Sequence, residues 1–298
     1  MDMNNIKVFR LAYAMFGSLN IEKMVQYYTE TIGYRLSEKT EDGSAYLSNG
    51  LDHHNIVLTP HKHKGIKRYG YQLDGKLSIG EVQEELKKQG IHSQIKSDEQ
   101  PGVREMLEVK DPDGNVIELF TEMDMPATGY GNTGIVPHKL GHIAFYAKNM
   151  QKTIQFYEEA LGFMFTDTIG DNFANFLTCN HDHHTLNIVS SNKSNQLHHI
   201  AFELKDSSHQ YLSSEVLAKH GYEIIWGPSR HTSGHNIATY HYDPDGNVVE
   251  LFIDMDRYIP ELGIFEPKPW HEELPLTPRR WEGLSSWGTE FEVDLANV

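Results

Sequence analysis

The sequence predicts an α+β protein of two homologous modules, each made of paired βαβββ units whose sheet curls around a cavity. Two observations carry this prediction: a long internal repeat, and an alternation of helical and strand periodicity inside each copy. The length of 298 residues allows two modest domains with a sizeable core. The composition, 39% hydrophobic and 23% charged, is that of an ordinary folded protein.

The repeat is visible at both ends of the copies. The segment LAYAMFGSLNIEKMVQYYTETIGY, which begins at Leu11, aligns with LGHIAFYAKNMQKTIQFYEEALGF, which begins at Leu140. Further on, KDPDGNVIELF with Glu118 aligns with YDPDGNVVELF with Glu250. The offset taken from these residue numbers is 129 at the start and 132 at the end. Agreement at both ends of a unit of roughly 120 residues indicates a duplicated module.

These alignments divide the chain into four parts. Residues 1–125 form the first module, 126–137 a glycine- and proline-containing linker, 138–256 the second module and 257–298 a tail. We expect the tail to be irregular and to pack on the body, because its prolines interrupt regular structure and its tryptophans favour burial. The residues concerned are Pro260, Pro267, Pro269, Pro275, Pro278, Trp270, Trp281 and Trp287.

Each module contains two predicted helices. Asn149 is a suitable N-cap for an apolar stripe over 150–161 that ends at a glycine, and 21–32 repeats this pattern in the first module. Second helices are predicted over 212–220 and 79–89, each also followed by glycine. The β-branched and aromatic runs between the helices indicate strands.

Charge and cysteine content exclude several classes of protein. A net charge of −16 repels phosphate backbones and anionic lipid head groups, so we expect no nucleic-acid partner and no membrane association. The single cysteine, Cys179, excludes an intrachain disulfide and a thiolate zinc site. The N-terminal residues lack the pattern of a secretion signal, and we expect a cytoplasmic protein.

The tetrapeptide HIAF occurs twice in the second module, at His142–Phe145 and at His199–Phe202. Side chains alternate between the faces of a strand, so each histidine lies opposite the isoleucine and phenylalanine that pack into the core. His198 shares the packed face or begins the strand, and is therefore the less suitable ligand. The two copies present His142 and His199 in the same way.

Glu250, in NVVELF, lies on the face opposite its apolar neighbours, where a carboxylate is costly unless a cation or a donor meets it. A metal ion satisfies this glutamate and both histidines. Two imidazoles and one carboxylate form the facial triad typical of non-haem Fe(II), with positions left open for substrate and dioxygen. Mn(II) accepts the same donors, so the ligands alone leave Fe(II) and Mn(II) both open.

The motifs LGHIAFYAKN, LHHIAFEL and GPSRHTSGHNIATYHYDPDGNVVELF resemble those of the type I extradiol ring-cleavage dioxygenases. This is the catechol 2,3-dioxygenase and 2,3-dihydroxybiphenyl 1,2-dioxygenase group of the vicinal oxygen chelate superfamily. The resemblance spans both modules, with the distinctive motifs in the second. It implies a glyoxalase/bleomycin resistance/dioxygenase-like fold with Fe(II) bound by His142, His199 and Glu250.

The resemblance also implies three catalytic side chains. The family has a histidine fifteen positions before the second ligand, which here is His184. It has a histidine and a tyrosine nineteen and ten positions before the glutamate, which here are His231 and Tyr240. His184 would accept and return the catechol proton, with neighbouring His183 as the alternative, while His231 and Tyr240 would donate hydrogen bonds to the bound diolate.

The activity implied by the resemblance is extradiol cleavage of a catecholic ring by O2, as in the catabolism of aromatic compounds. Both oxygen atoms enter a ring-opened semialdehyde or keto acid. The partners are a catecholic small molecule and O2, and the family commonly forms homo-oligomers. Monocyclic and bicyclic catechols both stay open; the residues suggested for the pocket wall are Phe173, Phe176, Trp226 and His235.

One strand register can be predicted in advance. If Tyr240 and Glu250 face the same cavity from neighbouring strands of a hairpin, Tyr242 must oppose Val248. The loop 243–247 then has five residues, although DPDG suggests four.

The first module keeps only part of this pattern. Glu118 and His54 match Glu250 and His184, but Tyr13 stands where His142 does, and the segment matching the second histidine is RYGYQ. We therefore expect a single metal site, in the second module.

Two other functions stay open. Another vicinal oxygen chelate enzyme, a hydroquinone-type ring cleaver or a glyoxalase-like isomerase, uses a similar metal site, although glyoxalase-like sites take ligands from both modules. A non-catalytic protein that binds an aromatic ligand needs no metal, and the retained triad argues against it.

Overall fold

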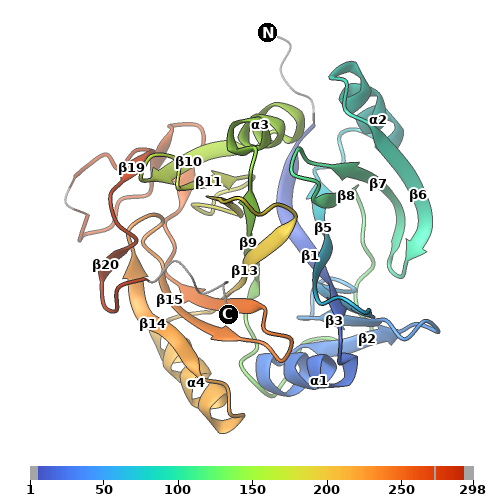
Figure 1. Ribbon diagram of the computed structural model, residues 1–298, viewed down its shortest axis with the longest axis horizontal. Coiled ribbons are helices and arrows are strands. Elements are labelled where there is room, and N and C mark those ends of the chain that lie inside the picture. The colour runs from blue at the N-terminus through green and yellow to red at the C-terminus, as the bar shows by residue number, and fades with distance from the viewer. Residues whose placement is uncertain (1–5, 272, 292–298) are drawn as a thin grey trace.

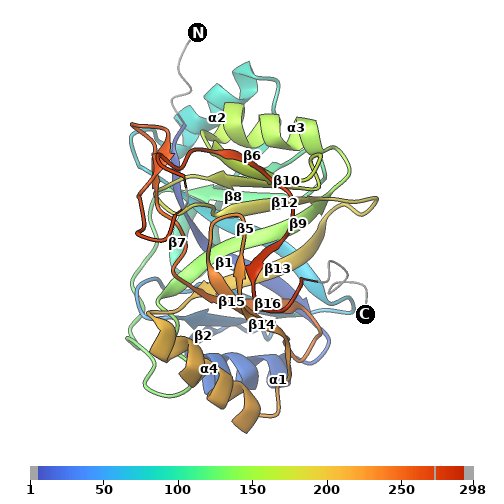
Figure 2. The ribbon, with the colours of Figure 1, turned by 90° about the vertical axis from the view of Figure 1, so that its left-hand side faces the viewer.

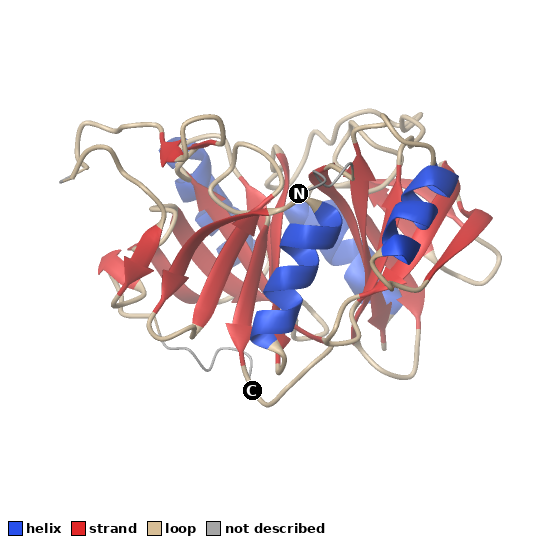
Figure 3. Cartoon of the chain, turned by 90° about the horizontal axis from the view of Figure 1, so that it is seen from above, coloured by secondary structure: helices blue, strands red, loops and turns tan. Residues whose placement is uncertain are grey.

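The computed structural model describes residues 6–271 and 273–291. Within this part of the chain, two large curved sheets and a two-stranded ribbon are joined by a few helices (Figure 1). Each large sheet belongs to one module, and Figure 3 shows the two sheets side by side. The predicted α+β fold of paired βαβββ units is confirmed.

The first sheet has the strand order β2-β3-β4-β1-β5-β8-β7-β6. In each unit the first strand pairs in parallel with the last, and the two units meet through the antiparallel pair β1 and β5. The strands are β1 (Val8–Ser18), β2 (Arg35–Lys39), β3 (Ala45–Ser48), β4 (Ile56–Pro60), β5 (Gly65–Leu73), β6 (Ser93–Gln100), β7 (Val103–Lys110) and β8 (Val116–Phe120).

The second sheet repeats this arrangement in the order β19-β10-β11-β12-β9-β13-β16-β15-β14-β20. Its units meet through the antiparallel pair β9 and β13. The module's strands are β9 (Lys139–Ala147), β10 (Met164–Ile169), β11 (Ala174–Thr178), β12 (Leu186–Ser190), β13 (Gln196–Glu203), β14 (Ile224–His231), β15 (Ile237–Tyr242) and β16 (Val248–Ile253).

The helices differ from the prediction in two respects. The first helix of each module widens into a π-helical turn: α1 (Ile21–Gln26) continues as η1 (Tyr27–Ile32), and α3 (Met150–Gln155) as η2 (Phe156–Ala160). The last helix, α4 (Ser207–Lys219), begins five residues before the predicted start of 212, whereas α2 (Ile79–Lys88) matches its prediction. The side chain of Asp206 caps α4 by accepting a hydrogen bond from the backbone N–H of His209.

The two modules pack through their helices and central strands. Figures 1 and 2 place α1 beside α4 and α2 beside α3. The hydroxyl of Tyr27 lies 2.7 Å from Nε2 of His241, and the hydroxyls of Tyr69 and Tyr157 are 2.6 Å apart. One hydrophobic core runs through both modules. Among the described residues, no helix has the length and apolar character needed to cross a membrane.

The tail extends the second sheet at both edges. Strand β19 (Arg279–Trp281) pairs with β10 at one edge, and β20 (Ser285–Trp287) pairs with β14 at the other. The remaining tail strands, β17 (Tyr258–Ile259) and β18 (Ile264–Phe265), form the small ribbon. The few residues between β19 and β20 therefore pass from one edge of the curved sheet to the other.

Candidate metal centre

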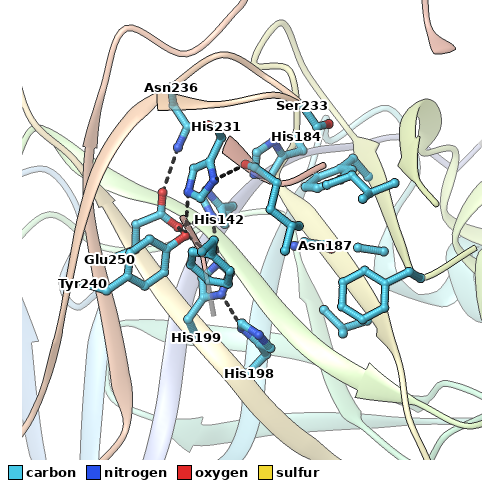
Figure 4. A pocket seen from close by; sticks show the side chains of 17 residues that line it. His142, His184, Asn187, His198, His199, His231, Ser233, Asn236, Tyr240 and Glu250 are labelled. Atoms are coloured by element: carbon cyan, nitrogen blue, oxygen red, sulfur yellow. Dashed lines mark hydrogen bonds and ion pairs between the residues drawn. The ribbon is translucent and has the colours of Figure 1, made fainter. Parts of the chain in front are cut away.

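The three proposed ligands meet in the second sheet (Figure 4). His142 on β9, His199 on β13 and Glu250 on β16 lie on three neighbouring strands. Nε2 of His142 and Nε2 of His199 lie 3.1 and 3.2 Å from Oε2 of Glu250, and the two nitrogens are 3.1 Å apart. All three residues are buried, at 3% exposure or less.

The register of the strands explains why these three side chains lie together. Ala201 on β13 pairs with His142 on one side and with Glu250 on the other, so all three share one face of the sheet. His199 lies two residues before Ala201 and points to the same face. On the opposite face, the isoleucine and phenylalanine of both HIAF segments pack into the hydrophobic core.

The donor set fits a divalent cation. Adjacent ligands of an octahedral ion with bonds of about 2.1 Å lie about 3.0 Å apart, close to the separations observed. Burial by itself would raise the pKa of Glu250, but His142 and His199 hold this pKa well below its usual range. The carboxylate is therefore anionic at neutral pH, the form that can bind a metal ion.

Two further donors orient the carboxylate. Nδ2 of Asn236 donates to Oε1 of Glu250 at 2.8 Å, and the hydroxyl of Tyr240 donates to Oε2 at 2.7 Å. Such outer partners fix the direction of a metal ligand. The predicted hairpin register is confirmed: Tyr240 pairs with Glu250 and Tyr242 with Val248.

His184 lies against the metal ligands, in the loop before β12. Its ring centroid is 4.3 Å from that of His142, and it lines the cavity with them. Burial and the neighbouring histidines hold the pKa of His184 well below its usual value, so the ring is neutral. His183 turns away and places Nε2 2.9 Å from Asp167, so the structure supports His184 over His183 for the cavity role.

His231, at the end of β14, lies on the same cavity. Its Nδ1 is 3.1 Å from the carbonyl of Leu284, and its Nε2 is 3.1 Å from the hydroxyl of Tyr240. A carbonyl only accepts, so Nδ1 carries the proton. Burial lowers the pKa of His231, and the neutral ring then presents Nε2 as an acceptor. The role of His231 as a donor to the diolate stays a prediction, because the Tyr240 hydroxyl beside Nε2 gives its single proton to Glu250.

Two of the four residues suggested for the pocket wall lie elsewhere. Phe173 and Phe176 line the cavity, which encloses about 520 Å³ of empty space including its mouth. Trp226 lies behind His231, with the two ring centroids 4.7 Å apart, and its Nε1 donates to the carbonyl of Thr289. His235 adopts a positive φ of 47° that directs its ring to Asp256, 2.6 Å away.

His198 departs from the predicted alternation. A β-bulge between Leu197 and His199 lets both histidines of the pair reach the cavity. Nδ1 of His198 lies 2.6 Å from Nδ1 of His199, so His198 supports the ligand from behind.

The sequence prediction missed half of the cavity wall. The motifs gave no sign of these residues because several are common apolar types on interior strands, and two come from the distant tail. The missed lining residues are Ile169, Ala174, Asn187, Val189, His198, Ser233, Asn236, Leu284 and Phe291.

The first module replaces the cation with a side chain. Gly70 pairs with Tyr13 and Glu118 as Ala201 pairs with its two ligands, so Arg68 takes the place of the second histidine. Arg68 Nη1 lies 2.7 Å from Oε1 of Glu118, and the Tyr13 hydroxyl and Gln100 Nε2 each donate to Oε2 at 2.5 Å. The guanidinium supplies the charge that a metal would supply.

A second group of potential ligands lies under the tail. His235, Asp256 and His271 lie close together, but Nζ of Lys268 is 3.1 Å from Oδ1 of Asp256. This ammonium group already balances the carboxylate, so the group forms an ion-pair network.

Residues 10–119 and 139–251 match the Glyoxalase/Bleomycin resistance protein/Dioxygenase superfamily. The chain belongs to this superfamily. Within the superfamily, it is 22% identical to a metapyrocatechase from Pseudomonas sp. (strain CF600), over 84% of this chain and 87% of that protein.

Two solved structures share the superfamily fold with this chain. Homoprotocatechuate 2,3-dioxygenase from Brevibacterium fuscum, in complex with 3,4-dihydroxyphenylacetate, has a TM-score of 0.82 at 19% identity, covering 100% of this chain and 94% of its own. The Mn(II)-bound glyoxalase from Novosphingobium aromaticivorans also has a TM-score of 0.82, at 22% identity, covering 96% and 92%.

Proposed function

We propose that this protein is an Fe(II)-dependent extradiol dioxygenase that opens a catecholic ring with O2, with Mn(II) as the alternative ion. One observation carries the proposal: three ligand atoms within 3.2 Å of one another share a cavity with His184, His231 and Tyr240. The curated relative named metapyrocatechase supports the same chemistry.

His142, His199 and Glu250 would hold the metal, which would supply Lewis acidity and a route for electrons between the catechol and O2. The protein supplies the proton chemistry. Nδ1 of His184 lies 2.9 Å from Nδ1 of His183, so Nε2 is the atom left to accept a catechol proton and return it. Both oxygen atoms of O2 end in the ring-opened product, and one proton returns to the oxygen that leaves the O–O bond.

His231 and Tyr240 position the diol. The Leu284 carbonyl fixes the proton of His231 on Nδ1, so Nε2 accepts a hydrogen bond from a hydroxyl on the substrate side. Burial and nearby Glu250 raise the pKa of Tyr240 well above its usual value, so the phenol keeps its single proton, which it donates to Oε2 of Glu250 in this structure and would redirect to the diol when substrate binds.

A glyoxalase-like isomerase is the second candidate, because a Mn(II)-bound glyoxalase has the same fold. A glyoxalase-like site would take metal ligands from both modules. In the first module of this chain, Arg68 occupies the position of the second histidine ligand. Isomerisation of a hemithioacetal needs no O2. Anaerobic turnover of methylglyoxal with glutathione would favour the isomerase, and strict dependence on O2 favours the dioxygenase.

The direct test loads the protein with Fe(II) under anaerobic conditions, adds catechol and then admits air. We expect a yellow ring-opened product and the uptake of one O2 per catechol. Iron-loaded protein that leaves monocyclic and bicyclic catechols unchanged contradicts the proposal.

Variants separate binding from catalysis. Glu250→Ala is expected to lose iron, whereas His184→Ala keeps iron and loses about 10²- to 10⁴-fold in rate, the usual scale for a general acid–base group. His54→Ala, at the matching position of the first module, is the control and keeps both. Equal loss of iron in the His184 and Glu250 variants would show that His184 is a ligand.

Homo-oligomerisation and a cytoplasmic location stay predictions from the sequence. Light scattering on the purified protein measures the first, and fractionation of cells the second.

A further inference from the structure

The cavity has a polar end and an apolar end. The metal ligands and the three catalytic side chains form the polar end. The rest of the wall is mainly apolar: Ile169, Phe173, Val189 and Leu284 line it, and Phe176 and Phe291 continue it up to His184 and Tyr240. A catechol that places its diol at the metal ligands therefore directs its ring substituent towards this apolar wall.

Leu284 closes the wall between two clusters. Its side chain packs against the cluster that contains Phe176 and also against the cluster that contains Phe291. Its carbonyl accepts hydrogen bonds from Nδ1 of His231 and from the backbone N–H of Thr232 at 3.2 Å. The backbone of this tail residue is therefore tied to the catalytic hairpin while its side chain faces the substituent.

Among the described residues that line the cavity, none is lysine or arginine. The nearby Arg230 lies 3.0 Å from Asp254 and stacks on Trp270, outside the cavity. The polar side chains in the wall would replace only part of the hydration that a carboxylate loses. Asn187 and Ser233 are neutral, and His198 already contacts His199 through Nδ1. Lys193 lies over the ring of Tyr146, with Nζ 5.1 Å from the ring centroid, and does not line the cavity. A carboxylate buried in the cavity would therefore lose its hydration without a cation from the wall, and the net charge of −16 adds to the cost.

We propose that this protein selects catechols whose ring substituent is uncharged and apolar, and that Leu284 is the tail residue that sets this preference. The inference rests on the proposed function for the placement of the diol. It goes beyond that function because it names the substrate class and a residue that determines it.

Matched substrates test the preference without any variant. We compare 3,4-dihydroxyphenylacetate with its methyl ester, and 3-(2,3-dihydroxyphenyl)propanoate with its methyl ester, so that both ring positions are sampled. Each pair shares a ring and a chain and differs in charge. We expect kcat/KM for the esters to exceed that of the acids by about 100-fold or more, the scale set by burying an unpaired carboxylate.

Anaerobic binding provides a readout that is independent of turnover. Fluorescence titration of the metal-loaded protein gives Kd for each compound, and the esters should bind more tightly in the same order. Unsubstituted catechol reports on the proposed function alone. If catechol is cleaved but ester and acid behave alike in kcat/KM and Kd, the proposed preference is wrong while the dioxygenase function stands. If catechol is not cleaved but the esters bind more tightly, the preference stands and the function is wrong.

Leu284→Arg tests the residue. A cation at this position should shift the acid-to-ester ratio towards the acid by at least about 10-fold, the usual worth of a charged hydrogen bond or more. Leu284→Met, which keeps an apolar side chain of similar volume, should leave the ratio unchanged. Leu262→Arg adds the same charge at an exposed tail position outside the cavity and should also leave it unchanged. Equal shifts in the two arginine variants, or none in Leu284→Arg, overturn the role of Leu284.

Discussion

Replacement of Arg68 by methionine tests whether its guanidinium group balances the charge of Glu118 in the first module, as a metal ion would. Glu118 is fully buried, and Arg68 is its cationic partner at 2.7 Å. Without Arg68, the carboxylate keeps only the neutral donors Tyr13 and Gln100. Removal of one partner of a buried pair costs about 3–5 kcal/mol, and the 30% exposure of the Arg68 side chain reduces this value.

We therefore expect Arg68→Met to lower the free energy of unfolding by about 2–4 kcal/mol at pH 7, because the variant leaves a buried carboxylate without its cationic partner.

Urea unfolding at pH 7, followed by circular dichroism, measures this loss. The double variant Arg68→Met/Glu118→Gln removes the buried charge and should recover most of the stability at pH 7. A loss below about 1 kcal/mol at pH 7 would refute the view that the guanidinium balances a buried charge.

Three further predictions concern the module interface and the metal. Asp113 accepts hydrogen bonds from the backbone N–H of Lys148 and from the Thr153 hydroxyl at the start of α3, so Asp113→Ala should cost about 1–2 kcal/mol in urea unfolding. Asp245, the matching residue of the second module, has an Oδ2 without a partner among the described residues, and Asp245→Ala should cost less. Burial lowers the pKa of His241 to about 3, so below its unfolded pKa of about 6.5 the unfolded chain binds a proton that the folded chain does not. Stability therefore falls with pH from 6.5 towards 3, and His241→Gln should reduce this slope by about 1.4 kcal/mol per pH unit; an unchanged slope would contradict the assignment. Anaerobic Fe(II) should raise the melting temperature of the natural protein but not that of Glu250→Gln, and equal shifts would place the ion elsewhere.

The three proposed ligands were accessible from the sequence because they lie in regular strands, whereas His184, His231 and Tyr240 came from the family resemblance. The repeated HIAF segments fix the side-chain parity of His142 and His199, and the hairpin around Glu250 allows only one register with Tyr240 on the same face. Local periodicity is enough for such positions.

The rest of the site depends on contacts between distant segments and on local changes of the backbone, and the periodicity of apolar residues in the sequence predicts neither. Leu284 reaches the cavity because β19 and β20 bind opposite edges of the sheet, a long-range pairing. The bulge before His199 brings His198 into the wall, and the positive φ of His235 takes that residue out of it. The role of Arg68 depends on its register with Glu118 across two strands.

We infer that one ion binds in the second module and none in the first. A crystal structure of protein loaded anaerobically with Fe(II), with anomalous data at the iron edge, shows how many ions bind and where. We predict a single peak in bonding contact with Nε2 of His142, Nε2 of His199 and Oε2 of Glu250. A peak beside Glu118, or the absence of a peak at the three ligands, would contradict the account.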